Sequence, residues 1–248
     1  MSTRFDEQDA FVIFDEVEVP KDLLFIDCNR EIYNTVMAIS WWPNIMQQTT
    51  VRALTKLEFA YALACRMAAA VGDESDITTD MLGELACYVE MTRNAIVASE
   101  QLCRDYGDGV VFPDDRALHP MRSLLTEWIP RALEIIMLIG SHNLLATPSR
   151  GMLDDERLRP LIDVYLDTAN EDGAEARAAL FRLAWDFVGS GLGSRVELYE
   201  RFYLGSRTRN RKMMHISSQE TTGWKMGSSP EIRGRGNELI DGILGTGQ

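Results

Sequence analysis

Residues 181–205 read FRLAWDFVGSGLGSRVELYERFYLG, and this stretch decides the fold class. Its first half repeats apolar residues at helical spacing, namely Phe181, Ala184, Trp185 and Val188. A glycine-rich break over residues 189–194 leads into a second, aromatic-rich helix that ends at Gly205. The break differs from a dinucleotide-binding loop, because no strand precedes it and its last position is Ser instead of Gly. The pattern therefore predicts two consecutive helices joined by a sharp turn.

The same helical spacing extends through most of the chain upstream. Apolar residues recur three and four positions apart over residues 54–68, 82–103 and 125–139. Shorter helices are expected at about 154–169 and 173–188. Long amphipathic helices in series predict a helical bundle with short connections.

One stretch near the start has a different pattern. Residues 10–19, AFVIFDEVEV, combine β-branched and aromatic residues and are closed by Pro20, which predicts a strand. No second stretch of comparable quality exists, since Val110, Val111 and Phe112 form only a short run. A lone strand cannot satisfy its own backbone donors and acceptors, so we expect its partners to come from outside this chain.

Composition excludes several classes of function. The 248 residues carry a formal net charge of −13, which argues against generic binding to nucleic acid and to anionic membranes. No apolar run approaches the roughly 18 residues needed to span a bilayer. The first residues show no secretory signal, so a cytoplasmic protein is expected. Four cysteines without a CxxC pair predict buried free thiols in place of disulfides or metal ligands.

Few residues form a pattern that carries chemistry. His119 and His215 are expected at the surface or as helix caps. His142 follows Gly140 and Ser141 at the end of an apolar helix, where backbone N–H groups could approach a phosphate; a simple helix C-cap is the alternative. No metal cluster, nucleophile motif or self-sufficient catalytic constellation is present, so no catalytic residue is assigned.

Several ordered segments together resemble a known family. They are residues 4–20, 56–60, 129–140 and 181–205, and the likeness covers the chain up to about residue 209. These segments are similar to the C-terminal half of the 4-hydroxyphenylacetate 3-hydroxylase large-component family. The resemblance implies a mainly α protein with an acyl-CoA dehydrogenase-like C-terminal helical bundle and one N-terminal strand left from a β-domain.

The resemblance also implies a division of the chain. Residues 1–28 would hold the terminal strand of a β-domain whose remainder has no counterpart here. Residues 29–205 would form the helical bundle domain. Residues 206–248, with a basic run at Ser206–Lys212, would form a poorly ordered tail, tied down at Trp224.

Members of this family are two-component flavin-dependent monooxygenases. They use reduced FAD, delivered by a separate flavin reductase, to hydroxylate a phenol beside its existing hydroxyl group. The Arg, Tyr and His that hold the phenol belong to the family's N-terminal half. The resemblance therefore implies a component that needs this N-terminal half for activity and that assembles as a homo-oligomer, a tetramer in the family.

Two turns are expected to contact the flavin on the strength of this resemblance. The first comprises Gly140, Ser141 and His142, which would approach the flavin pyrophosphate, often across a subunit boundary. The second comprises Gly205, Ser206 and Arg207. Family members usually read Gly-Asp-Pro at the second turn, so this chain differs there in both turn rigidity and local charge.

Two other functions remain open from the sequence. The chain could be a non-catalytic helical oligomerisation or regulatory remnant of such an enzyme. It could also be a dehydrogenase or dehydratase component of the same fold acting on an acyl-CoA. The 4-hydroxybutyryl-CoA dehydratases hold an iron–sulfur cluster through a His and a Cys, and the aligned positions here are Gln48 and Thr55. Neither side chain can replace imidazole or thiolate as an iron ligand, which disfavours a dehydratase.

Overall fold

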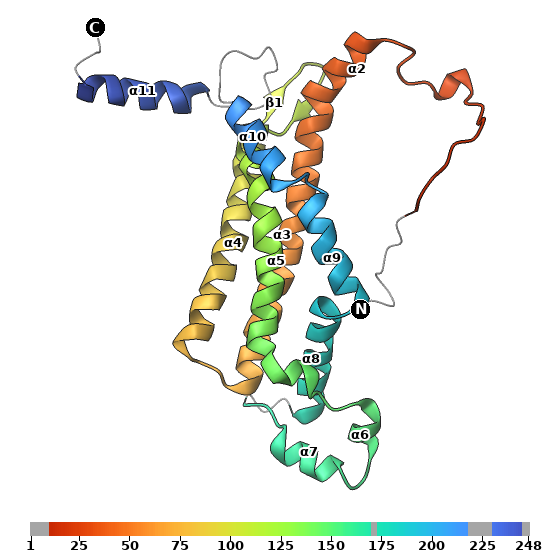
Figure 1. The fold of residues 1–248 in the computed structure, drawn as a ribbon, viewed down its shortest axis with the longest axis vertical. Helices are drawn as coiled ribbons and strands as arrows, with labels where there is room; N and C mark the ends of the chain where they lie inside the picture. The colour runs from red at the N-terminus through yellow and green to blue at the C-terminus, as the bar shows by residue number, and fades with distance from the viewer. Residues whose placement is uncertain (1–9, 170–172, 218–229, 245–248) are drawn as a thin grey trace.

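A bundle of long helices forms the body of the molecule in the computed structural model, which describes residues 10–169, 173–217 and 230–244 (Figure 1). Three helices run along its whole length: α3 (Trp42–Val71), α4 (Asp76–Gln101) and α5 (Asp115–Leu145). Two shorter helices, α8 (Ala174–Val188) and α9 (Gly191–Phe202), pack beside them. The mainly α bundle predicted from the periodicity is confirmed.

Smaller elements surround these five helices. A 3₁₀ turn, η1 (Lys21–Leu23), precedes α2 (Arg30–Val36), and the π-helical segment η2 (Met37–Trp41) joins α2 directly to α3. The remaining elements lie further along the chain: strands β1 (Arg104–Asp105) and β2 (Val111–Phe112), and helices α6 (Arg150–Asp154), α7 (Arg159–Tyr165), α10 (Arg207–Ser217) and α11 (Pro230–Leu244). The single helix predicted over 154–169 is therefore wrong, since the chain breaks between α6 and α7.

The core lies between α3, α4, α5 and α8. Each helix contributes the apolar face that its sequence repeat predicts, and the fully buried side chains include Leu57, Leu85, Leu125, Ile136 and Phe181. Burying side chains of this size stabilises the fold by about 1.5–3 kcal/mol each. The hydrophobic core is thus the main support of the bundle.

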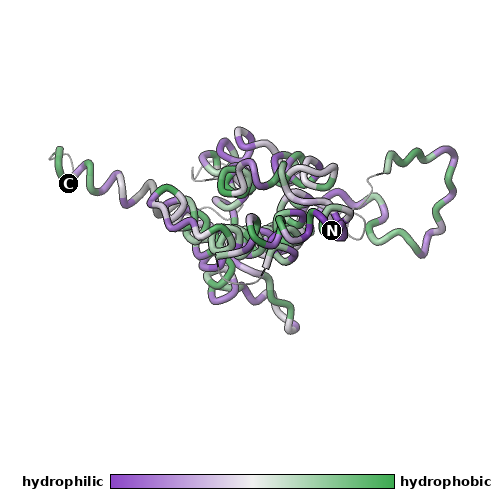
Figure 2. The backbone as a smooth tube through the Cα atoms, turned by 90° about the horizontal axis from the view of Figure 1, so that it is seen from below, coloured by the Kyte–Doolittle hydropathy of each residue, from purple (hydrophilic) through white to green (hydrophobic). Residues whose placement is uncertain are grey.

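Residues 10–19 do not form the predicted strand. Strands β1 and β2 pair with each other, with Arg104 opposite Phe112, and no described segment pairs with residues 10–19. Because a ladder needs a second strand, the segment is irregular and stands away from the bundle (Figure 2). Its apolar side chains are exposed, with Phe11 at 94% and Phe14 at 81%.

The basic run after residue 206 also differs from its prediction. The expected poorly ordered tail is instead helical at Arg207–Ser217, which forms α10 against α5. Asn210 is buried and donates a hydrogen bond to the carbonyl of Arg122, while Arg211 pairs with Glu127. These contacts to α5 explain the order of the run. Trp224 lies outside the described residues.

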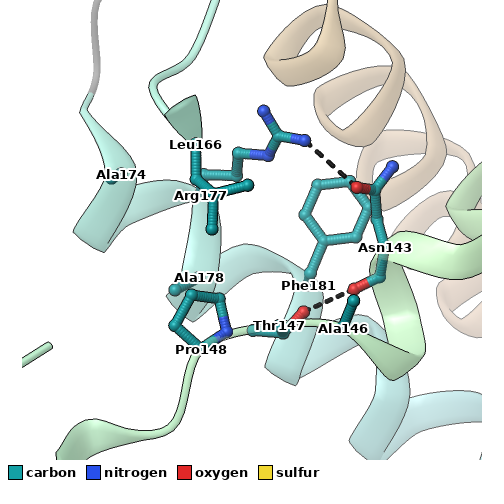
Figure 3. A pocket seen from close by; sticks show the side chains of 9 residues that line it. All are labelled: Asn143, Ala146, Thr147, Pro148, Leu166, Ala174, Arg177, Ala178 and Phe181. Atoms are coloured by element: carbon teal, nitrogen blue, oxygen red, sulfur yellow. Dashed lines mark hydrogen bonds between the residues drawn. The ribbon is translucent and has the colours of Figure 1, made fainter. Parts of the chain in front are cut away.

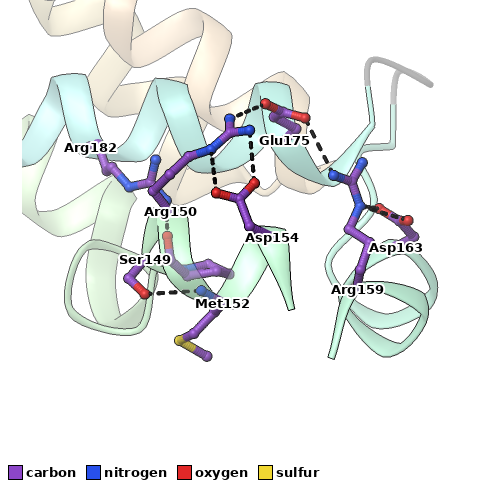
Figure 4. Close-up of polar contacts among 9 residues, drawn as sticks. Ser149, Arg150, Met152, Asp154, Arg159, Asp163, Glu175 and Arg182 are labelled. Atoms are coloured by element: carbon purple, nitrogen blue, oxygen red, sulfur yellow. Dashed lines mark hydrogen bonds and ion pairs between the residues drawn. The ribbon is translucent and has the colours of Figure 1, made fainter. Parts of the chain in front are cut away.

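A surface network links α6 and α7 to α8 (Figure 4). Glu175 on α8 accepts from Arg150 at 2.6 Å and from Arg159 at 3.4 Å, and each arginine also pairs with an acid on its own helix, Asp154 or Asp163. All five groups are exposed, so each pair contributes little to stability. The network orients the segment that contains α6 and α7 against α8, and the stability of the bundle comes from its apolar core.

The cysteines and the helix lengths bear on two further expectations. All four cysteines are free, as predicted, but Cys28, Cys87 and Cys103 are exposed and Cys65 is half-buried, so the expectation of burial was wrong. Cys87 is exposed because α4 directs Leu85 and Val89, two positions to either side, into the core.

Within the described residues, every helix is too short or too polar to cross a membrane.

Gly140 lies at a tightly packed point of α5, where Leu144 of the same helix and Met67 of α3 leave no room for a side chain. A Cβ atom at this position would lie 2.5 Å from Leu144 Cγ and 2.9 Å from Met67 Cε. Gly83 in the middle of α4 differs, because nothing lies within 4 Å of the Cβ it would carry. The two glycines therefore form a matched pair for testing the packing.

Gly140→Ala should destabilise the protein by about 1–3 kcal/mol, because the added methyl group overpacks a buried helix contact. Gly83→Ala should stabilise it by up to about 1 kcal/mol, because alanine has the higher helix propensity. Urea unfolding monitored by circular dichroism measures both changes. Equal effects of the two substitutions would contradict the assignment of Gly140 to packing.

Candidate functional site

The first predicted turn lies at the end of α5. Gly140 is buried against α3, whereas Ser141 and His142 are exposed. Ser141 has φ 46° and ψ −138°, a conformation that interrupts the helix and is costly for a residue other than glycine. Within this chain, Gly140 thus serves helix packing, and the exposed Ser141 and His142 are the members of the turn that remain accessible to a cofactor.

A small pocket adjoins this turn (Figure 3). Arg177 closes it by donating to Asn143 Oδ1 at 3.1 Å and to the carbonyl of Asp167 at 2.9 Å. The cavity of about 20 Å³ has room for about one water molecule. It is too small for any part of a flavin, so it is not the site.

The second predicted turn, Gly205–Arg207, joins α9 to α10. Gly205 has φ +84°, which favours glycine. Arg122 Nη2 donates to the carbonyl of Leu204 at 2.5 Å, and Asn210 Nδ2 donates to the carbonyl of Gly205 at 3.1 Å. The turn is therefore fixed by side chains of α5 and α10 although it lacks the Asp and Pro of the family pattern.

The two turns do not meet within one chain. Arg122, which holds the second turn, precedes Gly140 by 18 residues on α5. A helix rises 1.5 Å per residue, so the turns lie about 27 Å apart along α5. Both turns can contact one flavin only if two copies of the chain contribute to its site.

A buried ion cluster holds α9 against α3 close to the second turn. Glu200 on α9 is fully buried. Its carboxylate accepts from both terminal nitrogens of Arg52, with Arg52 Nη2 at 3.1 Å from Oε2, and from Lys56 Nζ at 2.6 Å. The Arg52 guanidinium lies 4.8 Å from the ring centre of Tyr199 and 5.0 Å from that of Tyr203. Two cations face one anion here, which leaves a local excess of positive charge.

Several buried side-chain nitrogens on α3 and α5 have no hydrogen-bond partner, and one of them belongs to Arg52 of this cluster. Within the described residues, the buried side-chain atoms that lack a partner are Trp42 Nε1, Arg52 Nε, His119 Nδ1 and Arg122 Nε. They belong to the first half of α3 and the first part of α5, and Arg122 also touches the second turn. Buried donors are usually satisfied, so their concentration marks this surface as a candidate binding site. We call it the α3–α5–α9 wall, defined by Trp42, Arg52, Lys56, His119, Arg122, Tyr199, Glu200 and Tyr203.

Burial shifts the pKa of several groups on this wall. It lowers the pKa of His119 to about 4, with the nearby Arg122 charge as the second cause, and lowers the pKa of Arg122 to about 10. It raises the pKa of Tyr199 to about 12. At neutral pH the imidazole is therefore neutral, the guanidinium charged and the phenol protonated.

Sequence reasoning missed most of this wall. His119 is predicted at the surface or as a helix cap but is 2% exposed, and its neighbour on α5, Leu118, belongs to a buried cluster with Met46 of α3. Arg52 and Glu200 are separated by 148 residues, and no local pattern reveals such a pair. The aromatic run that ends in Tyr203 was the one signal pointing to this region. No group of three or more potential metal ligands exists among the described residues.

Comparisons with known proteins identify the family. The model described as 4-hydroxyphenylacetate 3-hydroxylase C terminal matches residues 34–223. The chain belongs to this family. The 4-hydroxyphenylacetate 3-monooxygenase oxygenase component of Thermus thermophilus is 36% identical over 211 residues, which cover 84% of this chain and 44% of the relative. A probable 4-hydroxyphenylacetate 3-monooxygenase of Bacillus subtilis is 30% identical over 219 residues, 88% of this chain and 45% of that protein.

Solved structures agree with this assignment. The oxygenase component of 4-hydroxyphenylacetate 3-monooxygenase, crystallised with FAD and 4-hydroxyphenylacetate, superposes with a TM-score of 0.81 at 29% identity, covering 94% of this chain and 47% of that one. An archaeal 4-hydroxybutyryl-CoA dehydratase from N. maritimus shares the fold alone, with a TM-score of 0.63 at 17% identity over 82% of this chain and 38% of that one. The prediction that the chain corresponds to the C-terminal half of this family is thus confirmed. The chain spans about half the length of the relatives it matches.

Glu200→Gln should lower the free energy of unfolding by about 2–4 kcal/mol, because the partly buried Arg52 and Lys56 lose the buried carboxylate that they share. Glu197→Gln is the matched control on the same helix, since Glu197 forms an exposed pair with Arg201 and should contribute less than about 1 kcal/mol. Guanidinium denaturation checks both values. Equal losses for the two variants would contradict a special role for Glu200.

Acid should destabilise the native protein through His119. The unfolded chain protonates this imidazole below about pH 6.5, whereas the native state keeps it neutral to about pH 4. The contribution of His119 to the free energy of unfolding is therefore fully present above pH 6.5. It falls by about 2–3 kcal/mol as the pH drops from 6.5 to 4. In denaturation curves recorded from pH 4 to 7, His119→Gln should remove this slope and His142→Gln should leave it. Parallel curves for wild type and His119→Gln would refute the assignment.

Proposed function

We propose that this chain is the helical-bundle component of a reduced-flavin-dependent aromatic hydroxylase, active only beside an N-terminal half. Family membership carries the proposal, because curated relatives are named as oxygenase components of 4-hydroxyphenylacetate 3-monooxygenase and a related structure was crystallised with FAD. The chain spans 44% of the relative from Thermus thermophilus, so the proposed activity would also need a counterpart of that relative's N-terminal half.

The exposed segment over residues 10–19 supports the need for an N-terminal half. Its large apolar side chains, including Phe11, Ile13 and Phe14, are exposed, and no element of the described part of the chain covers them. Paired with strands of an N-terminal half, the segment would satisfy its backbone hydrogen bonds and bury these side chains. We therefore assign it as the edge through which the N-terminal half docks.

The α3–α5–α9 wall fits an anionic, aromatic cofactor such as FAD. Arg52 and Lys56 are each about a quarter exposed and outnumber the single carboxylate of Glu200, so a diphosphate would find unneutralised charge there. Tyr199 and Tyr203 stack on each other with ring centres 4.4 Å apart and supply an aromatic face. These four residues would hold the flavin from one copy of the chain, together with Gly205, Ser206 and Arg207. Ser141 and His142, beside the packing residue Gly140, would contact it from a second copy.

The bound flavin would supply the oxygen activation that hydroxylation of a phenol requires. The residues of this chain would orient the cofactor, neutralise its phosphates and help to exclude water from the reacting centre. The phenol itself would be held by the N-terminal half. We place the working enzyme in the cytoplasm as a homotetramer, supplied with reduced FAD by a separate flavin reductase.

Co-expression tests this proposal directly. The chain should co-purify with an N-terminal half of the same family and retain FAD, and the pair should hydroxylate 4-hydroxyphenylacetate when NADH and a flavin reductase are added. The chain alone serves as the control and should show no hydroxylation.

Failure to co-purify, together with no bound flavin, would contradict the proposal. A stable complex without flavin would favour the non-catalytic role in assembly. Strong hydroxylation by the chain alone would contradict the requirement for an N-terminal half.

A further inference from the structure

Residues 149–167, which contain α6 and α7, form a lobe at one end of the bundle (Figure 1). The lobe has a small apolar cluster of its own, separate from the core of the bundle and made of Leu153, Ile162 and Leu166 with Ala174 and Ala178 of α8. Other large apolar side chains of α7 face solvent, with Val164 71% and Tyr165 77% exposed. The lobe therefore rests on the bundle through few apolar contacts, which is typical of segments that open without global unfolding.

Both ends of the lobe are tied to the bundle. Before the lobe, Arg182 of α8 donates to the carbonyl of Pro148. After it, the N–H group of Ala169 donates to the carbonyl of Ala70 at the end of α3, with N and O 3.1 Å apart. Thr168, beside this second tie, is buried. The ties leave the segment between them as the part that can move, so they define two hinges.

Glu175, in the first turn of α8, holds both helices of the lobe (Figure 4). Its carboxylate accepts from Arg150 of α6 at 2.6 Å and from Arg159 of α7 at 3.4 Å. Because one carboxylate serves both arginines, its loss releases α6 and α7 together. The three side chains are exposed, so salt screens their attraction. Rising ionic strength therefore shifts the lobe towards opening.

Arg177 of α8 connects the lobe to the end of α5 (Figure 3). It donates to the carbonyl of Asp167 at 2.9 Å and to Asn143 Oδ1 at 3.1 Å. Leu166 of the lobe also lines the cavity of about 20 Å³ that Arg177 closes. When the lobe moves away, Arg177 loses the Asp167 carbonyl and the cavity loses one wall. Asn143 directly follows His142, so the lobe is linked to the turn predicted to contact the flavin.

We propose that residues 149–167 form a lid that opens as one unit about hinges at Pro148 and Ala169, with Glu175 as its latch. The open state releases Arg177 and uncovers the small cavity beside it, whereas the closed state ties the lobe to the end of α5. The lid goes beyond the proposed hydroxylase function, because its opening requires neither a flavin nor an N-terminal half.

Native-state hydrogen exchange of the 248-residue chain, read by mass spectrometry at single-amide resolution, tests the lid. The amides of Leu153, Ile162 and Leu166 each donate to a carbonyl within the lobe, so they report its opening. They should share one protection factor, at least about 100-fold below that of Ile136 in the core of α5. Raising NaCl from about 50 mM to about 500 mM should lower their protection about threefold and leave that of Ile136 unchanged.

A variant of the latch assigns the effect to Glu175. Glu175→Gln keeps the shape of the side chain and removes its charge. It should lower the protection of all three lobe amides about threefold at low salt and abolish most of their salt dependence. Glu58→Gln is the matched control, because Glu58 forms an exposed ion pair with Arg93 on the long helices. It should leave the lobe amides unchanged, and circular dichroism checks that both variants are folded.

Three outcomes would overturn the proposal. Lobe amides as strongly protected as Ile136 would mean that the lobe opens only when the bundle unfolds. Different protection factors for α6 and α7 would mean that they do not move as one unit. Equal exchange of the lobe in Glu175→Gln and Glu58→Gln would mean that Glu175 is not the latch. Hydroxylase activity plays no part in this readout, so its result is independent of the proposed function.

Discussion

The buried carboxylate of Glu200 is the constraint on which the functional half of this structure depends. It comes from α9, and both of its charge partners, Arg52 and Lys56, come from α3. Their mutual attraction fixes where α9 ends and hence where the chain turns into α10. The turn is then fastened to α5 through Arg122 and Asn210. This charge cluster thus fixes the position of α9 against α3 and, through the turn that follows, the start of α10. Apolar packing alone would define these positions less closely.

The same cluster explains why the α3–α5–α9 wall is suited to anions. Two cations share one carboxylate, and a third cation, Arg122, has no acid partner among the described residues. A protein with a net charge of −13 thereby keeps a local positive surface beside exposed tyrosines. Such a surface attracts phosphate or carboxylate groups to one place and leaves the rest of the molecule acidic.

The spacing of apolar residues along the sequence predicts the helices, because their formation depends mainly on residues close together in the chain. The helices over 54–68, 82–103 and 125–139 follow directly from apolar spacing. The glycine-rich break forms a tight turn between α8 and α9, and a Cβ at Gly193, in the first turn of α9, would meet the backbone of Phe187 at 2.7 Å. Patterns that depend on distant partners were less informative. Residues 10–19 have the composition of a strand but have no pairing strand among the described residues. The basic run forms α10 because α5 offers it acceptors and an acid.

The candidate site was harder to predict than the fold for the same reason. The resemblance predicts Gly205, Ser206 and Arg207 as cofactor contacts, and the structure places their turn beside Arg122 of the wall. Gly140 proved to be a packing residue, although its neighbours remain accessible. The buried state of His119 and the pairing of Glu200 arise from tertiary contacts between residues far apart in sequence. Only the arrangement of the helices shows them.

Native-state hydrogen exchange tests the central role of Glu200 most directly. If the ion cluster holds α9 in the bundle, the amides of Tyr199–Phe202 should exchange with an opening free energy close to that of the core amides of α3 and α5. Exchange of these α9 amides through a local opening with a much lower free energy, while α3 and α5 stay protected, would contradict the account.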